Sequence, residues 1–333
     1  MKIFIISALG VVAGLALVVY LAFQFSPWPS VLIIRHVFSQ GDRTAMDALE
    51  KHVPPGIAER QDLAYGDGSD EIFDLYYPAG TDRPLPTIVW THGGAWVAGS
   101  KEGVGNYLKI LAGHGYTTVG LDYTTAPTAT YPTPVHQVNA ALAHLVANAD
   151  EYNVDPDNIV LAGDSAGSQI TAQIANIVTA PDYARLMGVT PALEASQLDG
   201  VLLFCGAYDL AQVNLKGSFS WFLHTVLWAY TGTKDFMNDP GVASASVIDY
   251  VTGEFPRTLI TAGNGDPLES QSVAFADKLE SVGVSVDSIF YPADHEPSLP
   301  HEYQFDLDEE DGRAVLERTL TFLGTALPAP SGQ

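Results

Sequence analysis

Apolar and polar positions follow two different periods along the chain from about residue 70 onward. Short apolar runs, rich in β-branched residues and bounded by Gly or Pro, predict strands over 71–78, 86–94, 116–123, 158–163, 200–209, 257–263 and 284–292. The longer segments between them have helical spacing and cover 105–115, 134–152, 165–180, 268–283 and 312–323. This alternation predicts an α/β domain with a mostly parallel sheet covered on both faces. In such sheets, functional groups gather at the carboxyl ends of the strands.

Residues 207–250 depart from this alternation. They contain an aromatic-rich segment over 219–230, FSWFLHTVLWAY, which predicts one helix inserted between two strands. Because the insertion follows the carboxyl end of a strand, it is either additional core or a lid over a pocket, and both interpretations stay open. The pattern predicts one domain over 70–328 with a cap insertion over 207–250.

The first 34 residues have a different composition. After Lys2 the next charged residue is Arg35, and the stretch from Ile3 to Phe25 is almost wholly apolar. About 20 apolar residues are enough to cross the hydrocarbon core of a membrane. The apolar part of a secretory signal is shorter, about 7–15 residues, and ends in a small-x-small cleavage site that is not found here. We therefore expect residues 1–26 to form an uncleaved transmembrane anchor.

Residues 27–69 are expected to form an amphipathic or cap segment. Trp28 lies between two prolines and suits the membrane interface, where aromatic rings gather. The run over 31–38, VLIIRHVF, fits either the membrane surface or packing against the domain behind it. Lys2 and the free amino group favour a cytoplasmic N-terminus and an extracytoplasmic domain, although two arginines after the anchor oppose that orientation.

Composition limits the classes of function. Hydrophobic residues make up 47% of the 333 residues, which is ample for a large core and excludes global disorder. With 39 acidic and 15 basic residues the formal net charge is −24, and such a surface repels nucleic-acid backbones. Cys205 is the only cysteine, so there is no intrachain disulfide and no thiolate metal cluster. Its apolar surroundings, VLLFC, predict a small buried residue.

A serine lies between two glycines where a predicted strand becomes a predicted helix. The sequence over 159–170 is IVLAGDSAGSQI and contains the pattern G-x-S-x-G. In a strand–turn–helix context this pattern is a nucleophile elbow, whose glycines permit the close packing of a strained turn. The helix N-terminus adds positive potential and free N–H groups beneath the serine. We interpret Ser165 as a catalytic nucleophile.

A glycine-rich loop, WTHGGAW, follows another predicted strand. Acyl transfer at a serine creates an oxyanion that backbone N–H groups stabilise, and glycines let the backbone approach it closely. Gly93, Gly94 and Ala95 are the candidate donors in this loop, and Ala166, next to the nucleophile, is the other. His92 is interpreted as a brace of the loop and not as the catalytic base.

A serine nucleophile needs a histidine that takes its proton and a carboxylate that orients this histidine. Asp266 follows the next-to-last strand in a Gly- and Pro-rich loop, where the acid is expected. Asp209 is its rival, and its alternative interpretation is a turn residue that caps the insertion. Two histidines, His295 and His301, follow the last strand.

Together these motifs resemble the hormone-sensitive-lipase-like esterases of the α/β-hydrolase fold. The resemblance covers about residues 70–325 and rests on HGGAW, LDYTTAP, NIVLAGDSAG, FPRTLITAGNGDPLES and FYPADHEPSLPHEYQF, which occur in the family's order. It implies an α/β-hydrolase fold with a helical cap. It also implies these roles: nucleophile Ser165, acid Asp266, and an oxyanion hole from Gly94, Ala95 and Ala166, supported by Gly93.

The family pattern gives mixed guidance on the base. Counted from Asp266, His295 has the nearer separation, whereas His301 aligns without a gap when counted back from the terminal helix, with Tyr303 as the aromatic residue two positions on. We predict His301. Two departures from the family occur: Ala95 replaces a third glycine but keeps its N–H, and DYTTAP lacks the usual arginine and leucine, which concerns local packing.

The predicted function is hydrolysis of carboxylic esters through a Ser-His-Asp triad and an acyl-enzyme. The expected partners are a small-molecule ester and, through the N-terminal helix, a membrane. No cofactor or metal is expected, because the other histidines lack metal-ligand spacing and no H-E-x-x-H, P-loop or dinucleotide motif occurs. HGGAW also matches the H-G-G-x-W motif of arylformamidases, which cleave an N-formyl amide, so this reaction is one alternative. A membrane-tethered binding module on an inactive hydrolase scaffold is the other.

Overall fold

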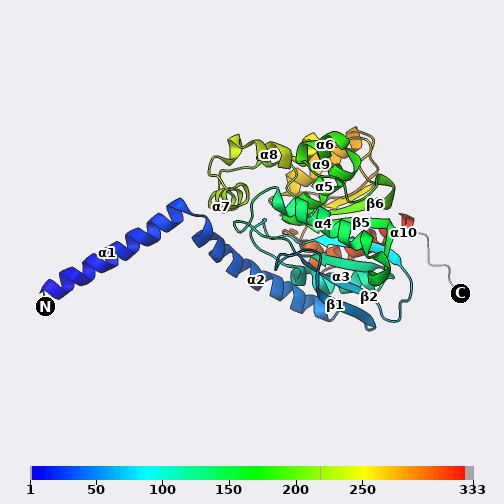
Figure 1. Ribbon diagram of the computed structural model, residues 1–333, viewed down its shortest axis with the longest axis horizontal. Helices are drawn as coiled ribbons and strands as arrows, with labels where there is room; N and C mark the ends of the chain where they lie inside the picture. Colours follow the sequence, from blue (N-terminus) through cyan, green and yellow to red (C-terminus); the bar gives the residue numbers. More distant parts are fainter. Residues whose placement is uncertain (1, 218, 327–333) are drawn as a thin grey trace.

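The computed structural model describes residues 2–217 and 219–326 (Figure 1). Its centre is an eight-stranded sheet with the order β1-β2-β4-β3-β5-β6-β7-β8. The six strands β4, β3, β5, β6, β7 and β8 are neighbours in this order and pair in parallel. Strand β2 pairs antiparallel with β4 on one side and with β1 on the other. The predicted α/β fold with a mostly parallel sheet is confirmed. The strands are β1 (Ile57–Ala64), β2 (Ile72–Pro78), β3 (Leu85–Thr91), β4 (Thr117–Leu121), β5 (Val154–Asp164), β6 (Leu198–Phe204), β7 (Thr258–Thr261) and β8 (Val286–Ile289).

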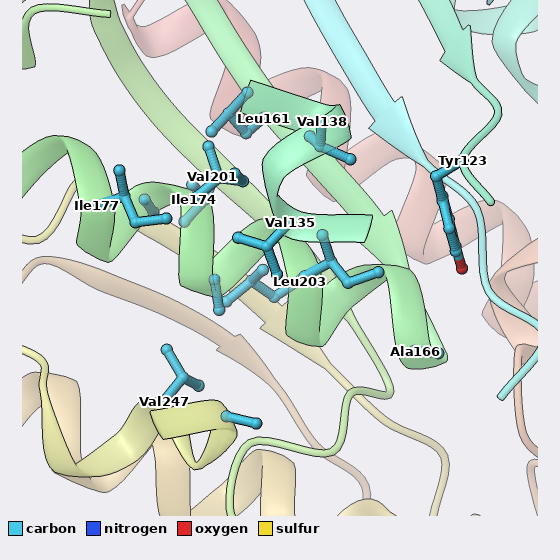
Figure 2. Packing of buried hydrophobic residues seen from close by; sticks show 14 of the residues in the cluster. Tyr123, Val135, Val138, Leu161, Ala166, Ile174, Ile177, Val201, Leu203 and Val247 are labelled. Carbon is cyan, nitrogen blue, oxygen red and sulfur yellow. The ribbon is translucent and has the colours of Figure 1, made fainter. Parts of the chain in front are cut away.

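Helices cover both faces of this sheet (Figure 1). Successive side chains of a buried strand point to opposite faces, so Val89 of β3 belongs to one core and Ile88 to the other. The first core lies under α4, α5 and α9, and Figure 2 shows Val135 of α4 and Ile174 of α5 close to Leu161 and Leu203 of the sheet. The second core lies under α3 and α10. The helices on the sheet are α3 (Gly105–Ala112), α4 (Thr133–Ala147), α5 (Ser165–Thr179), α6 (Pro181–Met187), α9 (Glu269–Ser281) and α10 (Glu310–Ala326).

The sheet begins earlier in the chain than the boundary predicted at residue 70. Its first strand, β1, has the sequence IAERQDLA, pairs with β2 at the edge of the sheet, and has side chains that are exposed or half-buried. An edge strand with one solvated face needs no continuous apolar run. For this reason the search for apolar runs predicted the seven strands β2 to β8 but not β1.

Two helices, α1 (Lys2–Phe25) and α2 (Trp28–Glu50), precede the sheet. The segment Gly10–Phe25 of α1 and α2 are bent by 82° with respect to each other, and α1 projects away from the rest of the molecule (Figure 1). Among the described residues no single helix is long and apolar enough to cross a membrane, whereas this bent pair meets the requirement together by length and composition. The transmembrane helix predicted over 1–26 is therefore not confirmed.

The first half of α2 packs against the sheet domain with one side only. Val31 and Ile34 are buried in the first core, and Arg35 donates hydrogen bonds to the carbonyl groups of Val97 (2.7 Å) and Ala126 (3.1 Å). The opposite side of these turns is apolar and exposed. Residues 31–38 were predicted either to lie along a membrane surface or to pack on the domain. One face of this segment packs on the domain.

The insertion between β6 and β7 contains α7 (Ser220–Thr231), α8 (Pro240–Ala245) and short 3₁₀ turns. Tyr230 of α7 is buried and stacks on Trp96 with ring centroids 4.7 Å apart. Phe222, one of the half-buried residues of α7, stacks on Phe38 of α2 at 6.1 Å. One side of α7 therefore adds to the core, and the turn nearer its N-terminus joins α2 above the carboxyl end of the sheet.

Candidate active site

Ser165 stands at the sharp turn from β5 to α5. Its φ of +51° lies in the left-handed region, which is strained for a residue with a side chain. Close packing around the turn excludes side chains at both neighbouring glycines: a Cβ at Gly163 would lie 2.6 Å from the Gly167 backbone, and a Cβ at Gly167 would collide with the Thr91 carbonyl oxygen. The two glycines let α5 approach β3 and β5 closely enough to hold the serine in this conformation.

His301 connects the serine to a carboxylate. Its Nε2 lies 2.9 Å from the Oγ of Ser165, and its Nδ1 lies 2.8 Å from Oδ2 of Asp266. Asp266 is 6% exposed, and its other oxygen accepts the Leu268 N–H at 2.7 Å, which fixes the carboxylate in the loop after β7. The structure thus brings together the predicted nucleophile, base and acid in the geometry of a Ser-His-Asp triad.

The two rival residues lie elsewhere. His295 hydrogen-bonds through Nε2 to Oδ2 of Asp311 at 2.9 Å, on the side of the loop that faces α10. Asp209 accepts the N–H groups of Ala211 and Gln212 and caps a 3₁₀ turn at the start of the insertion. Each rival therefore has a local structural partner of its own, away from the hydroxyl of the serine.

The loop after β3 presents free N–H groups next to the serine. Within the part of the chain that the structure describes, the amides of Gly94 and Ala95 donate to no protein acceptor, and both residues have positive φ, +102° and +53°. Ala166 is the second residue of α5, and the first N–H groups of a helix have no partner within it. These three amides are available to an oxyanion.

Gly93 was predicted to donate its N–H to the oxyanion, but in the structure this N–H has another partner. Its N–H donates to Oδ2 of Asp164 at 2.8 Å, so this amide is already engaged. His92 braces the loop as predicted from its position: its ring is buried, donates from Nδ1 to the Gly93 carbonyl group at 2.7 Å, and stacks on Tyr123 at 4.4 Å. Gly93 and His92 hold the loop in place for the amides that follow.

A pair of carboxyl groups lies behind the site, and sequence reasoning missed it. Asp164 is buried and accepts the indole N–H of Trp90 at 2.6 Å; burial, followed by the charge of Glu302, raises the pKa of Asp164 to about 7. Glu302 has a φ of +61°, and its Oε1 lies 3.7 Å from Nε2 of His301. Burial, and then the charge of Asp164, also raises the pKa of Asp42 on α2, to about 6.

This acidic surrounding acts on His301. Burial on its own would lower the pKa of the imidazole, but the acidic groups of Cys205, Asp266 and Glu302 outweigh burial, so that the net pKa is raised well above the ordinary 6.5. Burial raises the pKa of the Cys205 thiol to about 11 and keeps it neutral near pH 7. The charge of Cys205 is therefore absent at that pH, and Asp266 and Glu302 are the groups that raise the pKa of His301. The imidazolium that forms during acyl transfer is therefore stabilised by this site.

Two cavities meet at His301. The larger, about 740 Å³, opens over Ser165 and is mainly apolar. Its walls come from α7, from Phe38 of α2 and from the loop after Asp266, and include Phe222, Leu223, Val226 and Leu268. The smaller, about 350 Å³, lies on the other side of the oxyanion loop between α2 and Glu302, and is lined by Asp42 and Asp164. An ester bound at Ser165 would find an apolar side and an acidic side.

Among the described residues, Cys205, Asp266 and His301 are the one group whose ligand atoms lie close enough together to hold a metal ion, within 4.8 Å of one another. Both ring nitrogens of His301 are already in hydrogen bonds with Ser165 and Asp266, and the thiol of Cys205 is neutral. A metal would require a free ring nitrogen and a thiolate. In this structure the hydrogen bonds run from Ser165 through His301 to Asp266, as in a proton relay.

Comparison with known proteins gives the family. The family model BD-FAE matches residues 73–279, which include most of β2, the oxyanion loop, the nucleophile elbow and Asp266. The chain belongs to the BD-FAE family. The resemblance to α/β-hydrolase esterases that the motifs indicated is thereby confirmed.

The relatives of this BD-FAE chain include several esterases. An esterase of Gibberella moniliformis is 28% identical over 262 residues, covering 73% of this chain and 77% of the relative. Esterase LipQ of Mycobacterium tuberculosis is 29% identical over 278 residues, 80% of this chain and 62% of the relative. Carboxylesterase NlhH of the same organism is 27% identical over 260 residues, 74% and 75% of the two chains.

Solved structures share the fold. Esterase B of Lactobacillus rhamnosis superimposes with a TM-score of 0.75 at 23% identity, over 88% of this chain and 94% of that protein. The same esterase in an inhibited form, described as C6-C4 SN3 inhibited, gives a TM-score of 0.78 over 90% and 97% of the two chains. At this identity the likeness establishes the α/β-hydrolase fold.

Proposed function

We propose that this protein hydrolyses carboxylic esters with an apolar acyl chain, with Ser165 as nucleophile, His301 as general base and Asp266 as the acid that orients the base. The chain is a carboxylic ester hydrolase by its family and by the esterases among its relatives. The observation that carries the assignment of residues is the position of His301, within 2.9 Å of Ser165 and 2.8 Å of Asp266.

The proposed mechanism follows from this geometry. The Oγ of Ser165 attacks the ester carbonyl carbon while Nε2 of His301 takes its proton. The carbonyl oxygen becomes an oxyanion that the amides of Gly94, Ala95 and Ala166 stabilise. Collapse of this intermediate breaks the ester bond, and the alcohol leaves with the proton held by His301. Water then attacks the acyl-enzyme with His301 again as base, and the carboxylic acid is released.

The apolar cavity supports an apolar acyl group. Its volume of about 740 Å³ has room for a medium or long chain, and aromatic and aliphatic residues of α7 form much of its wall. An N-formyl amide, the substrate type of the alternative reaction, has a one-carbon acyl group and would leave most of this cavity unfilled. The esterases among the relatives favour ester hydrolysis over formamide hydrolysis.

We also propose that α1 attaches the protein to a membrane, with the hydrolase domain on the extracytoplasmic side. Phe23 is half-buried, but the other large apolar side chains of α1 that the structure describes are 39–80% exposed, including Val11, Leu15, Val18 and Phe25. Water contact by so many apolar residues is unfavourable, and insertion into lipid removes it. Fractionation of cells that express the full chain tests this proposal, because loss of α1 would move the protein from the membrane to the soluble fraction.

The esterase assignment is tested with p-nitrophenyl esters from acetate to decanoate. We expect hydrolysis by the parent protein, a rate that depends on acyl length, and loss of this activity in Ser165→Ala. Hydrolysis that persists in a folded Ser165→Ala protein would refute the proposed nucleophile.

A further inference from the structure

An exposed apolar face surrounds the junction of α1, α2 and α7. On α2 it consists of Leu32, Ile33 and Val37, which are 50–61% exposed. At the start of α7 it consists of the N-cap residue Phe219 and of Trp221, 56% and 54% exposed. We name these five residues the doorway face. Exposed apolar side chains that gather in one place mark a binding surface on a water-soluble domain.

The doorway face is continuous with both α1 and the apolar cavity. α2 and α7 are in contact through the stacked rings of Phe38 and Phe222, and both rings line the cavity over Ser165. Phe219 of the doorway face lines the same cavity. The segment after α7 reaches the end of α1, because Lys234 hydrogen-bonds to the Gln24 carbonyl group. An apolar molecule on this face therefore lies next to the opening of the cavity.

The distribution of charge points to a lipid surface as the occupant. Acidic residues number 39 in the chain, yet none occurs from Met1 to Gly41 or from Leu210 to Lys234, the two segments that contain α1, the doorway face and α7. Lys2, Arg35, Lys216 and Lys234 are the charged residues of these two segments. Anionic lipid head groups repel acidic surfaces and attract basic ones. These two segments therefore lack the negative charge by which an anionic membrane repels the acidic remainder of the protein.

The angle between the helices fits the same occupant. A helix bent by 82° from one that crosses the membrane runs nearly parallel to the membrane plane. If α1 inserts, α2 then lies along the lipid surface, with its buried side on the hydrolase domain and its exposed apolar side available to the lipid. Trp28 stands at the bend, at the depth where aromatic rings gather.

We propose that the doorway face docks on the bilayer and that the substrate ester passes from the lipid into the apolar cavity without crossing water. This inference rests on the proposed esterase function and names its substrate class: esters with acyl chains long enough to reside in a membrane. Each CH₂ of a long acyl chain that enters water costs free energy, so direct transfer between lipid and cavity favours such esters.

The test compares two esters with the full-length protein in phosphatidylcholine vesicles. p-Nitrophenyl palmitate resides in the bilayer, and p-nitrophenyl butyrate is soluble in water. We compare the parent with Trp221→Ser and Ile33→Ser, whose side chains do not line the cavity. Leu186→Ser on α6 is the matched control, because Leu186 is 56% exposed and lies outside the doorway face.

We expect both doorway variants to lose about fivefold or more of the rate on the palmitate ester, as removal of one large apolar side chain from a lipid contact implies, and to keep the rate on butyrate. Leu186→Ser should keep both rates. Equal palmitate rates in all three variants would overturn the inference. A parent that cleaves neither ester would instead refute the proposed function.

A second measurement decides the docking face independently of activity. Lipids brominated on their acyl chains quench the fluorescence of tryptophans that enter the bilayer. We expect quenching in the parent and a clear reduction in Trp221→Phe. Quenching that is the same in both proteins would place Trp221 outside the lipid and contradict the proposal.

Discussion

At the scale of single residues, the site combines a triad with a carboxyl group that the triad does not require. Glu302 follows the base directly along the chain, has a left-handed backbone conformation, and holds its Oε1 3.7 Å from the Nε2 of His301. Its partner Asp164 also binds the amide of Gly93 and so fixes the oxyanion loop. One acidic pair therefore contacts both the base and the loop that supplies the oxyanion donors.

The pH dependence of hydrolysis tests the role of Glu302. Catalysis needs neutral His301, so kcat/KM should rise with pH through the pKa of this histidine, which Asp266 and Glu302 raise. Glu302→Gln removes a negative charge that favours the imidazolium. The rising limb of the profile should therefore move to lower pH, as measured with a p-nitrophenyl ester across pH 5 to 10.

Glu280→Gln is the control for this profile, since Glu280 is exposed on α9 away from the triad. Its rising limb should coincide with that of the parent. A limb that stays in place in Glu302→Gln, or moves to higher pH, would show that Glu302 does not favour protonation of His301.

The triad and the oxyanion loop were predictable from sequence to different degrees. Ser165 and Asp266 follow predicted strands, so their position at the carboxyl edge of the sheet was implied by the pattern. His301 and His295 lie in one irregular loop without periodicity, and sequence alone could not place either ring. Glu302 could not be found at all, because its role depends on a left-handed backbone conformation that no pattern marks.

At the scale of elements, the site depends on how closely α5 packs on the sheet. Gly167 of α5 lies against the carbonyl oxygens of Thr91 and His92 at the end of β3, with no room for a Cβ. The contact aligns the helix N-terminus with the oxyanion loop. Both the stability of the fold and the activity of the site therefore depend on this contact between α5 and β3.

Gly167→Ala should destabilise the fold. The added methyl group forces α5 away from β3, and overpacking of this kind costs about 1–3 kcal/mol or more. The free energy of unfolding from urea titration measures the effect. Gly324→Ala is the control: a Cβ there meets nothing within 4 Å in α10, so this change should leave stability equal or increase it by about 0.5–1 kcal/mol. Equal stability in the two variants would contradict the proposed close contact.

The helix α7 sets the acyl pocket in this account. Leu223 is half-buried and lines the cavity beside Phe222. Leu223→Trp fills part of the volume, so hydrolysis of p-nitrophenyl decanoate should fall about tenfold relative to acetate, since 1.4 kcal/mol changes a rate ratio tenfold. The measurement is kcat/KM across the ester series.

Leu186→Trp places the same bulky residue on exposed α6, and its chain-length profile should match the parent. If decanoate and acetate fall together in Leu223→Trp, then α7 does not select the acyl chain and the large cavity holds another part of the substrate.

At the scale of the whole molecule, residues 1–41 contain no acidic residue, whereas all 39 acidic residues lie in the rest of the chain. The mostly parallel sheet and the alternation of strands and helices were predictable, because interior strands such as β5 and β6 are buried on both faces and read as apolar runs. β1 was not, because half of its side chains face solvent. Whether the insertion was core or lid could not be predicted, since α7 has both a buried side and a cavity-lining side.

The central claim is that His301, and not the neighbouring His295, is the base for Ser165. The most direct measurement is kcat/KM for p-nitrophenyl butyrate in His301→Ala and His295→Ala, with folding checked by circular dichroism. We predict a loss of roughly 10⁴-fold or more in His301→Ala, the size seen when a triad member is removed, and a rate close to the parent in His295→Ala. A folded His301→Ala protein that retains activity, or a folded His295→Ala protein that loses it, would contradict the account.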